Sequence, residues 1–178
     1  MHIIKHFMTI TKHRRLVRQG CFKVGLYWRG LVHDLSKYSP SEFWVGAKYY
    51  QGYRSPNNAE REAIGYSGAW LHHKGRNRHH FEYWMDYSAT GTKGFVPAKM
   101  PTKYIVEMFM DRVAACKTYN GKAYSQADPY AYFEKGRDHI IMEEDSKALL
   151  EKLLLMLKEK GEDETCRYIR RRVLKNQK

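Results

Sequence analysis

The chain has 178 residues, of which 43% are hydrophobic and 29% are charged, a balance typical of a globular protein rather than a disordered one. An excess of Lys and Arg over Asp and Glu, 32 against 19, gives a net charge of +13. This charge favours anionic partners, but it does not choose among nucleotides, nucleic acids and acidic proteins. The three cysteines are widely separated and form no CxxC pair, so a disulfide framework or a zinc ribbon is not expected.

Neither a signal peptide nor an apolar run of transmembrane length is evident in the sequence. We therefore expect a single domain over residues 1–178, located in the cytoplasm and without a membrane partner.

Helix signals begin near the N-terminus, where basic and apolar positions alternate in a way compatible with helical faces. The segment Ser39-Pro40-Ser41-Glu42 predicts a helix start, with Ser39 as the N-cap and Glu42 closing a capping box. A second start is predicted at Ser55-Pro56, with Gly75 at the end of that helix.

Three more helices are predicted in the second half. One begins after Pro101 and ends near Gly121, and the next begins at Asp128-Pro129. The third covers residues 146–160, where five leucines form an apolar face.

Gly161 ends that helix, and residues 162–178 are predicted to form a basic C-terminal helix capped by Asp163. Residues 88–99 predict a loop, and no alternating run predicts a strand. The expected fold is all-α, a compact bundle of about six or seven helices.

Several aromatic residues lie among these helices, including Tyr27, Trp28, Trp44 and Tyr53. At helical spacing such residues are expected in the core. The alternative is that they stack on nucleobases beside the basic residues.

Nine histidines are unevenly placed. His33 is adjacent to Asp34, the doublets His72-His73 and His79-His80 follow, and His13 precedes the pair by twenty residues. Neutral imidazole and carboxylate are the usual ligands of first-row divalent metals. The pattern therefore predicts a site for manganese, iron, cobalt, nickel or zinc around His33 and Asp34.

Asp111 lies on a largely apolar helix and therefore needs a partner, because burial of an unpaired charge is costly. That partner is either the metal or one of the many arginines. His2, His6 and His139 have no evident partner in the sequence, and we expect them at the surface.

The order of His13, His33-Asp34 and Asp111 resembles the H…HD…D pattern of the HD-domain metal-dependent phosphohydrolases. Residues 33–37 are also similar to the HDxxK segment of the HD-GYP branch, and His72-His73 to its later histidine doublet. Residues 29–43, 70–73 and 77–80 together look like a small uncharacterised family of bacteria and phages, and this likeness extends over residues 12–121.

The resemblance implies an HD-like helical fold and a role for each matching residue. His13, His33, Asp34 and Asp111 would hold the metal. Three residues, Lys37, His72 and His73, would act as catalytic residues, and His79 and His80 would complete a second metal site or supply an acid. Histidines that merely bond to helix ends are the structural alternative for His79 and His80.

This sequence departs from the HD-GYP branch in two ways. The GYP triplet is absent, and residues 35–71 contain no histidine where that branch has one. One metal is therefore expected rather than two or three.

The leading functional hypothesis is a metal-dependent hydrolase of phosphate esters, with a phosphate-containing small molecule such as a nucleotide as substrate. One alternative is an HD-like oxygenase that holds two irons. The other is a non-catalytic protein that binds nucleic acid or another partner through its basic surface.

Overall fold

The computed structural model describes residues 1–91 and 94–175, and within them the chain is mostly helical. Eight α-helices are present in the described residues, which confirms the all-α prediction with one or two helices more than expected. They are α1 (Ile3–Val24), α2 (Tyr27–Val32), α3 (Pro40–Lys48), α4 (Pro56–Ile64), α5 (Gly68–Lys74), α6 (Thr102–Asn120), α7 (Asp128–Gly136) and α8 (Glu144–Tyr168). Short 3-10 turns connect several of them: η1 (Leu35–Tyr38), η2 (Phe81–Trp84), η3 (Gly121–Ala123) and η4 (Arg137–His139).

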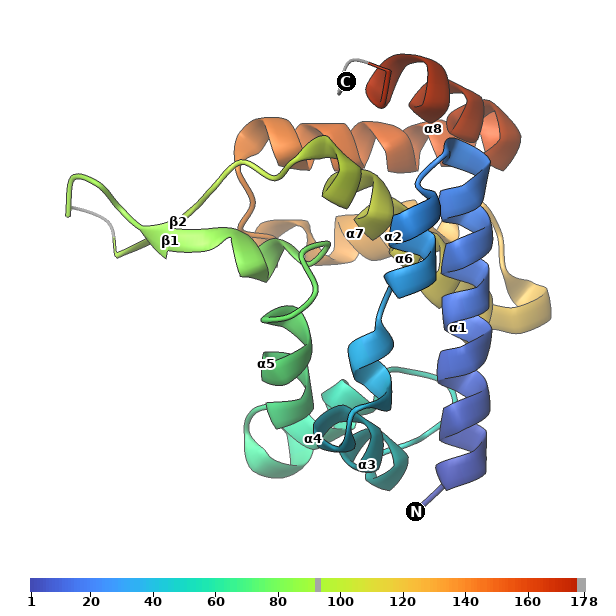
Figure 1. Ribbon diagram of the computed structural model, residues 1–178, viewed down its shortest axis with the longest axis vertical. Helices are drawn as coiled ribbons and strands as arrows, with labels where there is room; N and C mark the ends of the chain where they lie inside the picture. Colours follow the sequence, from blue (N-terminus) through green and yellow to red (C-terminus); the bar gives the residue numbers. More distant parts are fainter. Residues whose placement is uncertain (92–93, 176–178) are drawn as a thin grey trace.

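Helix α1 runs along one side of the molecule and crosses α6, which passes behind it (Figure 1). One stripe of α1, spaced by three or four residues, is buried along its length: His6, Ile10, His13, Val17, Cys21 and Val24. The N-terminal part of this stripe is partly polar, whereas the C-terminal part is apolar. The same helix therefore contributes to a polar interior at one end and to the hydrophobic core at the other.

The hydrophobic core lies between α1, α6, α7 and α8. In α8 the leucines repeat at helical spacing, and Leu150, Leu153, Leu154 and Leu157 are completely buried. They pack with Phe109 of α6 and Phe133 of α7 in the same cluster. The predicted apolar face of residues 146–160 is confirmed by this packing.

Two predictions about helix ends were wrong. The single helix expected from Ser55-Pro56 to Gly75 is divided into α4 and α5, because Gly65 adopts a left-handed backbone (φ 85°) and ends α4. Glu42 forms no capping box. Its carboxylate is buried and accepts hydrogen bonds from His72 and His73 instead.

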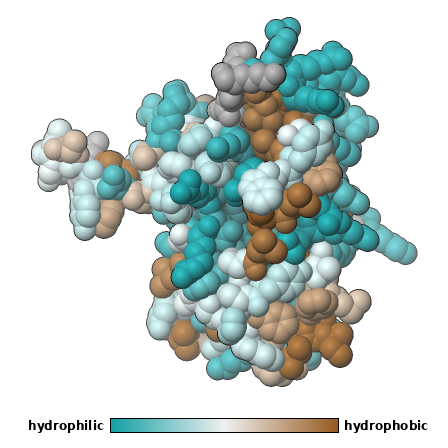
Figure 2. Space-filling model, viewed as in Figure 1, coloured by the Kyte–Doolittle hydropathy of each residue, from teal (hydrophilic) through white to brown (hydrophobic). Residues whose placement is uncertain are grey.

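The sequence did not predict the short antiparallel hairpin at residues 85–97, whose second strand lies within the predicted loop 88–99. Strand β1 (Met85–Tyr87) pairs with β2 (Phe95–Pro97), and the rings of Tyr87 and Phe95 stack with centroids 4.8 Å apart. The hairpin projects from the body of the molecule and adds little to its interior (Figures 1 and 2).

At the C-terminal end, Gly161 breaks the helical path of α8, as expected, with φ 85° and ψ 170°. Because the chain is helical again directly after Gly161, Asp163 lies in the first turn of this segment and does not cap it. A π-helical turn, η5 (Ile169–Val173), continues it, and residues 176–178 of the predicted basic helix lie outside the described residues.

No helix within residues 1–91 and 94–175 combines the length and the apolar character that a bilayer span requires.

Glu162 joins the segment after Gly161 to α1 and α6 through ion pairs with Lys23 and Lys117. Its carboxylate lies 2.7 Å from the Lys23 ammonium and also contacts Lys117. Burial raises the pKa of Glu162, but Lys117 and Lys23 outweigh it and hold this pKa below its usual value. The pairing therefore stabilises the fold above the unfolded pKa of about 4.3 and is lost as the pH falls through the lower folded value.

We expect Glu162→Gln to lower the free energy of unfolding at neutral pH by about 0.5–1 kcal/mol. The difference from the wild type should shrink as the pH falls below about 4. Urea unfolding at neutral pH and at a pH below about 4 measures this difference. Glu159→Gln, at an exposed position nearby, is the control. An equal loss at both pH values would contradict the assignment.

Candidate metal centre

Asp34 lies at the centre of the polar interior, directly after α2. It is completely buried and has a left-handed backbone, with φ 52° and ψ 30°, the only positive φ among the described residues other than glycine. Aspartate tolerates this conformation better than most residues, but it still costs about 1 kcal/mol. The turn brings the adjacent side chains to one point, with His33 Nε2 3.2 Å from Asp34 Oδ2.

The four residues expected to hold the metal lie together. His13 comes from α1, His33 and Asp34 follow α2, and Asp111 comes from α6. His13 Nε2 is 2.9 Å from Asp111 Oδ1 and 3.9 Å from Asp34 Oδ2. One ligand atom from each of the four lies within 4.8 Å of the others, so the group could hold a metal ion. Asp111 therefore faces histidines rather than an arginine.

A second group shares Asp34 and consists otherwise of histidines: Asp34, His73, His79 and His80. His73 Nε2 and His79 Nε2 lie 3.3 and 3.4 Å from Asp34 Oδ1. The first group faces Oδ2 of the same carboxylate. The two oxygens of Asp34 thus serve two adjacent groups, an arrangement that the expectation of one metal did not include.

Unsatisfied polar atoms mark both groups. Among the described residues, no well-aligned hydrogen bond reaches the following buried atoms: His13 Nε2, His33 Nε2, both carboxylate oxygens of Asp34, His73 Nε2, His79 Nε2 and His80 Nε2. Two of them still have a close polar neighbour, since His13 Nε2 lies 2.9 Å from Asp111 Oδ1 and Asp34 Oδ2 lies 2.6 Å from the Lys37 ammonium. Buried polar groups are nearly always paired, because an unpaired one costs about 1–3 kcal/mol. This concentration of imidazole nitrogen and carboxylate oxygen fits a first-row divalent metal.

Glu107 lies on the other side of two of these rings and was missed by the sequence reasoning. Its carboxylate is 3.0 Å from His33 Nδ1 and 3.4 Å from His79 Nδ1. Arg29 donates two hydrogen bonds to the same carboxylate, at 2.7 and 3.2 Å. Although Glu107 forms a third group with these histidines, its pairing with Arg29 favours a role in orienting them.

Glu42 has the same relation to the histidines of α5. His73 Nδ1 lies 2.7 Å from one of its oxygens, and His72 Nδ1 lies 2.6 Å from the other. The Nε2 atom of His73 is thereby directed to Asp34. His72, which was expected to be catalytic, belongs to none of the three groups, and its side chain is 24% exposed beside Glu42.

The charges of Asp34 and His80 follow from their burial together with the charged groups around them. Burial raises the pKa of Asp34, but His33, Lys37 and His73 outweigh it and hold this pKa well below its usual value. Burial and the neighbouring His79 and His73 hold the pKa of His80 well below 6.5. Asp34 is therefore ionised and His80 is neutral, which are the forms that bind metals.

Lys37 lies on η1 beside the centre. Its ammonium is 2.6 Å from Asp34 Oδ2, and burial lowers its pKa, but Asp34 and Asp111 outweigh this and raise it. Lys37 is therefore positively charged, and it lines a cavity of about 190 Å³ together with His13, His73, His80 and Asp111.

His6 lines the same cavity, so its expected surface position was wrong. It is 5% exposed, and its ring packs against Phe43 and Tyr50. The ring also fills the space at Gly46, where an added Cβ would lie 2.3 Å from His6 Nε2. Burial and the nearby Lys37 lower the pKa of His6 to about 4, so His6 is neutral.

A family profile matches residues 2–156, most of the chain and the whole of both histidine groups. The chain belongs to this family. It is described as a family of unknown function (DUF5662). No curated protein and no solved structure matches the chain. The family match names no superfamily, and the likeness to the HD-domain proteins rests on the motifs alone.

Because two groups share Asp34, the metal content of single variants should differ. After reconstitution with manganese or iron, we expect about two equivalents per chain. His13→Ala and His80→Ala should each lose about one of them, and Asp34→Ala both, because only Asp34 belongs to both groups.

Elemental analysis of protein purified without an affinity tag measures this, with His139→Ala, an exposed histidine, as the control. One equivalent that survives in His80→Ala would show that only the group on His13 binds metal. Less than about a tenth of an equivalent in the wild type would rule out both groups.

Glu107 provides a prediction that separates orientation from ligation. Glu107→Gln keeps the shape but weakens acceptance from His33 Nδ1, so metal affinity should fall by about ten- to a hundredfold without complete loss. Competition with a chromophoric chelator measures the affinity. Glu144→Gln, at an exposed position, is the matched control. Unchanged affinity would show that Glu107 serves only to neutralise Arg29.

Proposed function

We propose that this protein is a metal-dependent hydrolase of phosphate esters, with nucleotides as the substrate class. The observation that carries the proposal is the convergence of buried imidazole and carboxylate atoms around Asp34, several of them without a well-aligned hydrogen bond, beside a lysine and a cavity. A hydrolytic metal site needs such ligands together with access for substrate.

His13, His33, Asp34 and Asp111 would hold one metal ion, and His73, His79 and His80 would hold a second one with Asp34. A bound divalent metal supplies Lewis acidity toward a phosphoryl oxygen and lowers the pKa of water. Glu107 and Glu42 keep the imidazoles in the orientation that this requires, through the hydrogen bonds at Nδ1.

Two adjoining cavities support access for a substrate larger than a phosphate ion. The inner cavity of about 190 Å³ adjoins a second one of about 430 Å³. Six residues line both: Ser55, Trp70, His80, Asp111, Ala115 and Tyr119. The outer cavity also has the rings of Tyr53, Phe81 and Tyr132 in its wall. Aromatic walls of this kind accept a nucleobase by stacking.

Positive charge in the cavity supports an anionic substrate. Lys37 lies at the inner end, and its ammonium has three donors, so it can bind a phosphate oxygen while it contacts Asp34. Arg112 lines the outer cavity, and its buried Nε has no hydrogen-bond partner among the described residues. Burial lowers the pKa of Arg112, so an anionic ligand would offset an existing cost.

The sharing of Asp34 by two groups also favours a second reaction class, because oxygen activation by two irons needs paired sites. The cavity favours hydrolysis, since both of its ends contain a cation suited to phosphate. Oxygen consumption by the iron-loaded protein is the measurement that would reverse this preference.

The test is a panel of nucleotides, cyclic nucleotides and generic phosphate esters, assayed for release of phosphate or nucleoside with manganese, cobalt or iron. We expect turnover by the wild type and none by Asp34→Asn, because an amide is a poorer ligand than a carboxylate. Circular dichroism should show unchanged helical content. Asp138→Asn, at an exposed position, is the control.

Equal residual activity in wild type and Asp34→Asn would identify a contaminant. Absence of turnover with every compound of the panel, measured on metal-loaded protein, would contradict the hydrolase proposal. Arg112→Gln tests the outer cavity separately: KM should rise by about tenfold or more while metal content stays constant. Unchanged KM would remove Arg112 from the substrate site.

A further inference from the structure

A strongly basic hollow lies away from the metal centre, at the C-terminal end of the chain. It measures about 1050 Å³ and shares no lining residue with the two cavities at the centre. Six basic residues line it: Lys23, Arg167, Arg170, Arg171, Arg172 and Lys175. Hydrophilic residues cover this end of the molecule in the space-filling view (Figure 2).

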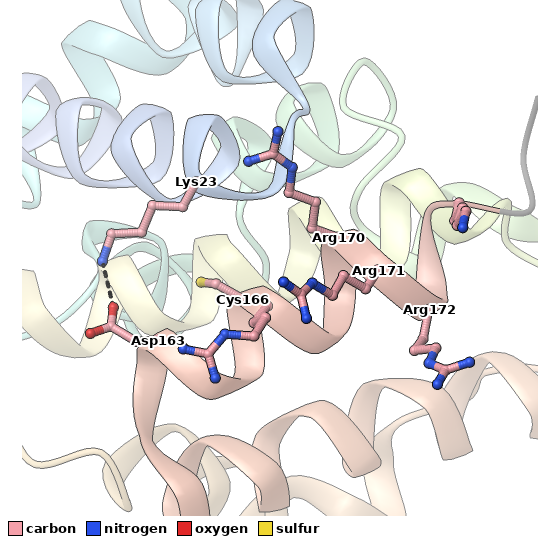
Figure 3. A pocket seen from close by; sticks show the side chains of 8 residues that line it. Lys23, Asp163, Cys166, Arg170, Arg171 and Arg172 are labelled. Atoms are coloured by element: carbon pink, nitrogen blue, oxygen red, sulfur yellow. Dashed lines mark ion pairs between the residues drawn. The ribbon is translucent and has the colours of Figure 1, made fainter.

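Most of this charge is not neutralised within the described residues. Lys23 pairs with Glu162 and Asp163, and Arg167 pairs with Glu164. The other four, Arg170, Arg171, Arg172 and Lys175, are exposed and form no ion pair among residues 1–91 and 94–175. Among the described residues that line the hollow, Asp163 alone has a carboxylate. In Figure 3 the three arginines fan out from one helical turn in different directions.

The segment that carries these arginines is fixed to the core rather than loose. Ile169 is completely buried, Cys166 is 6% exposed, and Tyr168, Val173 and Leu174 pack against the hydrophobic cluster. The guanidinium groups are therefore presented on a rigid base, which lowers the entropy lost when a partner binds.

This anchoring also decides between two anionic partners. A helix that lies on a membrane inserts its apolar face among the lipids. Here the apolar side chains of the segment are already packed against the protein core. A chain of phosphates needs only the exposed cations, and guanidinium binds phosphate with two parallel hydrogen bonds.

No aromatic ring among the described residues lines the hollow itself, but Lys23 links it to exposed rings, contrary to the core position expected of Tyr27 and Trp28. Lys23 lines both the basic hollow and a neighbouring one that includes Phe22. The Phe22 ring lies 5.3 Å from that of Tyr27, which is 55% exposed, and Trp28 is 71% exposed. Proteins that bind single-stranded nucleic acid combine basic residues, which contact the phosphates, with exposed aromatic rings, which stack on unpaired bases.

We propose that the hollow bounded by Lys23 and residues 167–175 is a binding surface for single-stranded nucleic acid. The phosphates contact Arg170, Arg171, Arg172 and Lys175, and a base stacks at the Phe22 and Tyr27 rings. This surface is independent of the metal centre.

The test uses a fluorescently labelled oligonucleotide of about 12 bases and the full chain, with binding followed by anisotropy from about 50 to 200 mM salt. The triple variant Arg170→Ala, Arg171→Ala, Arg172→Ala should bind at least about tenfold more weakly at low salt. Its slope of log affinity against log salt should fall by about 2, since three phosphate contacts are lost.

The matched control removes the same charge elsewhere, as Lys5→Ala, Lys122→Ala, Lys135→Ala, all exposed. It should lose less than about threefold. Tyr27→Ala should weaken single-stranded binding by about fivefold or more and leave duplex binding unchanged. Metal content and melting temperature should stay constant in all variants.

Equal loss in the two triple variants would overturn the proposal, because total charge alone would then explain binding. Absence of wild-type binding at low salt would overturn it as well. Vesicles of phosphatidylcholine and phosphatidylserine are the third arm. If the arginine variant loses vesicle binding as strongly as oligonucleotide binding, the surface attracts any polyanion and the assignment to nucleic acid fails.

Discussion

The burial of the Asp34 carboxylate is the constraint on which the polar interior depends. An ionised carboxylate without solvent requires compensating positive charge or donors, since its isolated burial costs far more than a fold can supply. Here Lys37 and several imidazoles surround the carboxylate. Asp34 has a left-handed backbone, and its Oδ2 lies near Lys37 and His33 while its Oδ1 lies near His73. Replacing the carboxylate would leave those neighbours without their common partner. The site and the local backbone are thus one structural unit, and neither can change alone.

Helices α1 and α6 couple this unit to the hydrophobic core, because each contributes to both. In α1, His13 and Val17 are one turn apart on the same buried stripe, and in α6 Asp111 follows Glu107 by one turn among apolar neighbours. A shift of either helix along its axis would move His13 or Asp111 and open the packing at the same time. Core packing therefore holds the imidazole and carboxylate positions to the accuracy that a metal site needs.

The sequence predicted what local signals encode and missed what only tertiary contacts determine. Proline signals located the starts of α3, α4, α6 and α7, and leucine spacing located the apolar face of α8. The predicted pair His33 and Asp34 lies in the polar interior, where other histidines gather around it. Glu42 was misassigned because a carboxylate after Ser39 fits a local capping pattern, whereas its real partners are thirty residues away in α5. Glu107 gave a usable signal that was overlooked: it lies on the same apolar helix as Asp111, one turn earlier, and a buried carboxylate there also needed a partner. His6 shows the converse, since its burial depends on the absence of a side chain at Gly46.

The two proposed sites differ in how they relate to the family. The histidine groups lie wholly within the matched residues 2–156, and their ligands come from α1, the turn after α2, α5, the segment after it, and α6. Within this range the fold of this chain has to satisfy the buried carboxylate of Asp34. The arginine segment lies outside that range and packs on the core through Cys166, Ile169 and their apolar neighbours. Its exposed arginines do not contribute to core packing, so their substitution should leave the structure around Asp34 unchanged. If both sites act on phosphates, the basic segment brings a nucleic acid to the protein, while the buried centre would act only on a group small enough to enter its cavity.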